Sequence, residues 1–156
     1  MKEVYRVEGI VNRGFVGQIT YMVNLEEPFS KLDIHFVFDA SKRKFSPDEI
    51  TPELIADTVA VCKKNYDLDI DENRARGIIL GDMKTEIHTL ATLNDEFLGC
   101  IHRQMTDRHM FFDGVNGTAT EGCIPRERFE GVLKVTVLAF NVIKDGTRYE
   151  LTVSGE

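Results

Sequence analysis

The sequence predicts a mainly β protein, built as an antiparallel two-layer β-sandwich with a helical insertion at residues 46–82. Three observations carry this prediction: period-two alternation through most of the first forty residues, a 3.6-residue pattern confined to the middle, and apolar runs flanking Asp145-Gly146 near the end. Packing helices at one end or edge of two sheets is the simplest way to bury these faces. A partly open barrel is the alternative architecture.

The first forty residues predict three strands, at 4–11, 15–25 and 32–39. Each alternates apolar with polar side chains, as expected of antiparallel strands with one buried face. Asn12-Arg13-Gly14 supplies turn residues after the first strand, and Pro28 interrupts the ladder after the second. The strand ending at Asp39 carries His35 on its polar side, where we expect a surface residue.

The segment 46–82 predicts two helices. Thr51 is a good N-cap followed by Pro52 at the first helical position, and apolar residues then recur at helical spacing to Tyr66. A second helix is expected at 72–80, capped by Asp71 and ended by Gly81. Asp67, Asp69 and Asp71 lie at or near the junction of the two helices, with the alternate spacing of a calcium loop. The segment lacks the glycine and the bidentate glutamate of such a loop, so it indicates a solvated linker.

Residues 84–105 favour a hairpin over a helix. An amphipathic helical stripe can be drawn through the segment, but it would include several threonines and be interrupted by Gly99. Asn94-Asp95 lies between two runs of similar length, where a tight turn would form. A two-residue turn there would pair residue 88 with 101, which would place His88 and His102 on opposite faces.

The strongest local signal predicts a C-terminal hairpin of strands 132–144 and 147–154 around Asp145-Gly146. The register would place Val142 opposite Tyr149, Phe140 opposite Leu151 and Leu138 opposite Val153. The first of these strands is apolar on both sides, so both of its faces need cover, from the helical insertion or from another subunit. A homodimer is therefore expected. Residues 113–131 are glycine-rich and predict mostly loop.

Length and charge bound the function. The 156 residues suit a single domain, 1–156, able to bury a core without a metal or a disulfide. A net charge of −7 and the absence of tryptophan argue against nucleic-acid binding. No apolar run reaches membrane-spanning or signal-peptide length, so no membrane partner is expected. Three cysteines without framework spacing favour reduced thiols and a cytoplasmic location.

Cys100, His102 and His109 are the candidate catalytic residues. Cys100 and His102 share one face if they lie on a strand, and an imidazole beside a thiol can hold it as the reactive thiolate. A buried cysteine beside a surface histidine is the alternative. Neither paired cysteines nor a zinc-type histidine motif is present, so we expect no metal and no cofactor.

Four arginines form a candidate binding site for a small anionic ligand, since the guanidinium fork suits carboxylate or phosphate. They are Arg103, Arg108, Arg126 and Arg128. The segment 101–128, which contains these four arginines, also contains four acidic residues, so local ion pairing is the alternative.

Four segments resemble a small group of uncharacterised bacterial proteins of similar length. They are LDIHFVFD (32–39), TPELI (51–55), LNDEFLGCIHRQ (93–104) and GVLKVTVLAFNVIKDGTRYELTVSG (131–155). The resemblance implies a bacterial origin and a strand assignment for 93–104, and it implies no activity.

Two functions remain open from the sequence. The first is a non-enzymatic binding or self-assembly module, suggested by the strand that needs cover on both faces. The second is a small hydrolytic or thiol-dependent enzyme using Cys100, His102 and His109. The enzyme requires these three groups to converge in one pocket, whereas dispersed side chains favour the module.

Overall fold

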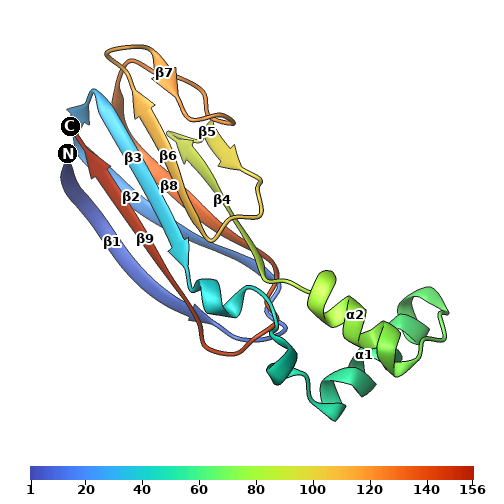
Figure 1. Cartoon of the computed structure of the whole chain (residues 1–156). Coiled ribbons are helices and arrows are strands. Elements are labelled where there is room, and N and C mark those ends of the chain that lie inside the picture. Colours follow the sequence, from blue (N-terminus) through green and yellow to red (C-terminus); the bar gives the residue numbers. More distant parts are fainter.

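The computed structural model describes residues 1–156 as two antiparallel sheets packed face to face, with a helical arm projecting from one end (Figure 1). The predicted mainly β sandwich is confirmed. The strands are β1 (Lys2–Val11), β2 (Gly17–Phe29), β3 (Lys31–Phe38), β4 (Glu86–Leu93), β5 (Glu96–Ile101), β6 (Asp107–Asp113), β7 (Thr118–Ala119), β8 (Phe129–Asn141) and β9 (Thr147–Gly155). The helices are α1 (Pro52–Tyr66) and α2 (Glu72–Gly81), preceded by 3-10 turns at Ala40–Lys42 and Pro47–Glu49.

The strand order is β1-β9-β3-β6-β7 in the first sheet and β2-β8-β4-β5 in the second. One apolar core fills the space between them, contributed by alternate residues of nearly every strand. In β3, for example, Leu32, Ile34 and Phe36 are completely buried. The intervening residues Asp33 and His35 therefore face outward from the first sheet.

The predicted C-terminal hairpin is wrong. Both strands exist, but β8 pairs with β2 and β4, whereas β9 pairs with β1 and β3 in the other sheet. The strand ends at Asn141, and the buried Val142 and Ile143 turn the chain across the end of the core. Asp145-Gly146 is thus part of a corner between sheets.

This corner also changes the faces assigned to β8. Val135, Val137 and Ala139 point into the core, whereas Phe140, predicted to be opposite Leu151, lies on the outer face with half its surface exposed. The prediction for β9 is correct in this respect, because its apolar residues Tyr149, Leu151 and Val153 are buried. A period-two pattern with apolar residues on both sides does not reveal which side faces the core.

The hairpin predicted at 84–105 is confirmed as β4 and β5, with Asn94 and Asp95 both at positive φ (53° and 66°). Its register differs by one residue from the prediction. Thr92 pairs with Phe97 but Ala91 pairs with Gly99, so Leu98 is the extra residue of a β-bulge. The predicted separation of His88 and His102 is therefore wrong, and their rings stack at 4.3 Å.

The helical insertion forms as predicted. Thr51 Oγ1 accepts a hydrogen bond from the Leu54 amide (3.2 Å), and the Asp71 carboxylate accepts one from the Arg74 amide (2.7 Å). The two helices pack on each other and extend away from the sandwich (Figure 1), so they leave both outer sheet faces uncovered. Neither helix is long and apolar enough to cross a membrane.

Candidate metal centre

The outer face of the first sheet carries two Asp-x-His sequences on neighbouring strands. Asp33 and His35 lie on β3, and Asp107 and His109 lie on β6. Residues two apart on a strand share a face, and the buried residues between and beside them fix that face as the outer one. The strands are antiparallel neighbours, so the two sequences run past each other in opposite directions.

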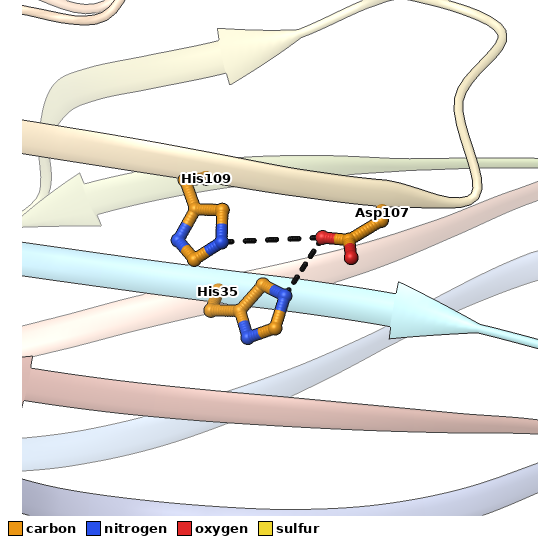
Figure 2. A group of neighbouring side chains, drawn as sticks. All are labelled: His35, Asp107 and His109. Atoms are coloured by element: carbon orange, nitrogen blue, oxygen red, sulfur yellow. Dashed lines mark hydrogen bonds and ion pairs between the residues drawn. The ribbon is translucent and has the colours of Figure 1, made fainter.

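The register of β3 and β6 brings the two histidines together. His35 lies directly opposite His109, and their rings are stacked with centroids 3.9 Å apart and planes 3° from parallel. Asp107 is two residues before His109 and lies opposite Val37, which places its carboxylate diagonally across from His35. Figure 2 shows the three side chains on the same side of the sheet.

Each histidine contacts the aspartate of the opposite strand. His35 Nε2 is 2.8 Å from Asp107 Oδ1, and His109 Nδ1 is 2.9 Å from Asp33 Oδ2. His109 Nε2 is left facing Asp107, at 4.0 Å from the same Oδ1 atom. One ligand atom each from His35, Asp107 and His109 therefore lies within 4.8 Å of the other two.

This donor set fits a divalent transition metal. Two imidazole nitrogens and a carboxylate oxygen are ligands found in zinc sites, and Zn²⁺ bonds to them measure about 2.0–2.2 Å. A hydrogen bond from His109 Nδ1–H to Asp33 would leave Nε2 unprotonated and turned toward the other ligands. Asp33, with 20% of its side chain exposed, is thus placed as a positioning residue for His109.

A hollow of about 820 Å³ adjoins the cluster along the same sheet face. Asp107 belongs to both, and Val37 and Ile10 supply part of the apolar lining. Arg148 also lines the hollow, and its guanidinium makes neither an ion pair nor a hydrogen bond. Because Asp107 lines the hollow, a fourth ligand of a metal held by His35, Asp107 and His109 would have room to approach from this side.

The structure does not bring Cys100, His102 and His109 together. Cys100 lies on β5 in the second sheet and His102 just beyond its end, whereas His109 is on the outer face of the first sheet. No hydrogen bond joins Cys100 to His102, whose ring stacks on His88 and meets the edge of Phe140. The predicted catalytic trio is thus divided between the two sheets.

The His88 and His102 pair has no carboxylate arrangement comparable to the first cluster. His88 is buried, and its Nε2 atom has no hydrogen-bond partner. Burial and then the neighbouring His102 hold the pKa of His88 below its usual value. Glu86 lies 3.7 Å from His88 Nε2, too far for a hydrogen bond.

The cysteine thiols show no sign of activation at Cys123. Burial raises the pKa of the Cys123 thiol to about 11, which disfavours the thiolate.

The four predicted anion-binding arginines are not gathered into one patch. Arg103 pairs with Glu121, Arg126 with Glu96 (2.7 Å) and Arg128 with Glu130 (2.6 Å). The first two pairs lie at opposite ends of β5.

Arg108 faces the interior, unlike the other three. It is 3% exposed and donates to the carbonyl oxygens of Ile101 and Met105, and its Nε has no partner. Burial lowers the pKa of Arg108 to about 10. Three of the four arginines therefore form local ion pairs, and the fourth, Arg108, is buried and donates hydrogen bonds to backbone carbonyl oxygens.

Sequence reasoning missed His35, Asp33 and Asp107 as candidate site residues. The available signal was the repeated Asp-x-His spacing on two segments that both alternate apolar with polar side chains. The spacing alone shows only that each pair shares a face. The pairing of β3 with β6, which is separated from it by the whole helical insertion, is what joins the two pairs.

A family model described as a family of unknown function (DUF6669) matches residues 1–155 of the chain. The chain belongs to this family. No curated protein and no solved structure matches the DUF6669 chain. The family assignment agrees with the expected membership of an uncharacterised domain family and assigns no chemistry to the cluster on β3 and β6.

Proposed function

We propose that this DUF6669 domain is a non-enzymatic binding module that binds one divalent transition-metal ion through His35, Asp107 and His109. The observation that carries the proposal is the convergence of three ligand atoms within 4.8 Å on two paired strands. The Asp33 carboxylate, 2.9 Å from His109 Nδ1, adds the outer partner typical of metal-bound histidines.

The ligand types select the class of metal. Imidazole nitrogens suit Zn²⁺, Co²⁺, Ni²⁺ or Cu²⁺, whereas Ca²⁺ and Mg²⁺ prefer sites made entirely of oxygen. The ligands sit on rigid strands of one sheet, so little ordering is needed on binding. Asp107 and His109 are both more than half exposed, so the ion can exchange freely with solvent.

The solvent exposure of Asp107 and His109 supports binding over catalysis, because catalytic sites exclude water. Three protein ligands leave at least one coordination position, as they also do in catalytic zinc sites, and water or a donor group of a partner molecule would fill it. The adjoining hollow gives such a partner apolar contact with Val37 and Ile10. Cys100 and His109 lie in different sheets, and this separation supports a binding module over a thiol-dependent enzyme.

Isothermal titration of the metal-free protein with ZnCl₂ tests the proposal. We expect one ion per chain and loss of binding in His35→Ala and His109→Ala. Asp33→Asn should weaken binding by about 10- to 100-fold, because it removes the carboxylate that orients His109. Acidification should also weaken binding, since imidazoles must be unprotonated to coordinate a metal.

The control is the double variant Cys100→Ser with His102→Gln, which removes a thiol and an imidazole outside the cluster. It should bind zinc as the wild type does. Retention of the one-to-one complex in His35→Ala, or its loss in the control, would overturn the assignment. If the wild type bound no zinc, the proposal would be wrong, and the Asp–His contacts between β3 and β6 would be surface interactions without a metal.

A further inference from the structure

Three of the four sheet edges of the sandwich are protected against pairing with another strand. Exposed edge strands present unpaired N–H and C=O groups, and proteins block them with charges, bulges, short strands or covering loops. The edge strand β7 has only two residues. The other edge of the same sheet, β1, carries charged side chains and a register shift near Tyr5.

The edge strand β5 is covered by the chain itself. Residues 122–124 run along it, with Cys100 N donating to Gly122 O (3.0 Å) and Ile124 N donating to Leu98 O (2.8 Å). The side chain of Cys123 lies against Gly99 at this point. An incoming strand would have to displace this segment.

The remaining edge strand, β2, is unprotected from Gly17 to Leu25, because its two glutamates, its proline and its register shift all lie between Leu25 and Phe29. From Gly17 to Leu25 it contains no charged residue and no proline, and its only ladder partner is β8. Met22, near the middle, is 67% exposed. A long, uncharged edge of this kind is a template for strand addition.

The backbone of β2 shows which residues offer hydrogen bonds at this edge. Asn94 N donates to Val132 O (2.9 Å), so the backbone groups of Val132 point toward β4. Asn24 is the β2 partner of Val132, and the two therefore form a non-hydrogen-bonded pair whose Asn24 backbone groups point to the free edge. The same alternation places the backbone groups of Gln18, Thr20 and Met22 at this edge.

We propose that a second copy of this chain pairs with β2 along this edge, antiparallel and related by a two-fold axis through Tyr21. The register places Gln18 opposite Asn24 and Thr20 opposite Met22 of the second copy. All four residues present edge-facing backbone groups, so the two copies form four hydrogen-bonded pairs, or about eight hydrogen bonds. The strand is thus complementary to itself, as a two-fold interface requires.

This register also leaves charge outside the contact. Glu26 and Glu27 fall beyond the paired stretch, and the nine residues within it are uncharged. Each copy nevertheless carries a net charge of −7, so two copies repel at long range. Added salt should therefore strengthen the dimer by screening this repulsion.

Sedimentation equilibrium over a range of protein concentrations tests the proposal. We expect the weight-average mass to rise from 17.7 kDa toward twice that value, and to do so at lower concentration when salt is added. Met22→Pro should weaken association by at least about tenfold, because it removes an edge-facing N–H without breaking the ladder to β8. Met22→Lys is a second variant, which places a charge within the paired stretch.

The matched control is Phe140→Lys, which alters the exposed apolar face of the same sheet and leaves its edge intact. It should associate as the wild type does. Amide exchange at Thr20 and Met22 should slow as the dimer forms, with no change along β1. A monomer at every concentration, association unaffected by both Met22 variants, or a dimer lost only in Phe140→Lys would each overturn the proposal.

Discussion

The Glu49–Lys144 contact should make the stability of the sandwich depend on pH in the acid range. Lys144 lies in the corner between β8 and β9, and Glu49 ends the short 3-10 turn that leads to α1. Lys144 Nζ is 2.7 Å from Glu49 Oε2, and Glu49 Oε1 also accepts from Ser46 N and Oγ, both at 2.9 Å. The contact therefore ties the base of the helical arm to the sandwich.

The magnitude follows from the pKa of Glu49. Lys144 first, and then the hydrogen bonds from Ser46, lower this pKa from 4.5 to about 2. If the whole pKa change arose on folding, it would contribute about 3 kcal/mol to the free energy of unfolding. Because 44% of the Glu49 side chain is exposed and solvent screens the pair, we expect Glu49→Gln to cost about 1 kcal/mol at neutral pH.

Urea denaturation of wild type and Glu49→Gln at a series of pH values measures this effect. A carboxylate with a lowered pKa in the folded state stabilises it above the unfolded pKa, and this contribution is lost as the pH falls from about 4.5 to about 2. The difference between the two proteins should thus shrink across that interval. Asp48→Asn is the control, since the Asp48 side chain makes no ion pair. A constant difference across pH, or none at pH 7, would refute the reasoning.

Two further predictions concern the buried side chain of Tyr149. Gly9→Ala should destabilise the domain by about 1–3 kcal/mol in urea denaturation, because a Cβ there would lie 2.2 Å from the Tyr149 ring; unchanged stability would show that the ring moves aside freely. Burial and then the 2.6 Å hydrogen bond to the Tyr21 hydroxyl raise the pKa of Tyr149, so one tyrosine should titrate late in an ultraviolet pH titration. Tyr21→Phe should lower that late transition, and four indistinguishable tyrosines in the wild type would contradict the assignment.

The sequence was sufficient where the determining interactions are local. The caps at Thr51 and Asp71 act within three residues, and the turn at Asn94-Asp95 depends on two backbone conformations. The alternation of β3 likewise assigned its buried and exposed faces correctly. These features need no knowledge of which strand lies beside which.

The sequence failed where a strand had to choose its neighbours. The turn chemistry of Asp145-Gly146 predicted a hairpin, but β9 finds two partners in the first sheet while β8 is held between β2 and β4. Similarly, the extra residue Leu98 moved His102 to the same face as His88. A tight turn makes local pairing available, and the burial of both sheets against one core decides whether it is used.

The candidate metal centre depends both on the local sequence pattern and on the tertiary pairing of strands. By itself the sequence determined that Asp33 and His35 share one face of a predicted strand, because side chains alternate along a strand. Asp107 and His109 have the same spacing and share one face of β6, but the sequence analysis did not predict a strand that contains them both. Only the tertiary structure decided that the two faces are one, by pairing β3 with β6 in the register that sets His35 opposite His109. Strand pairing joins residues distant in the chain, and the free energy that selects it comes from the whole buried core.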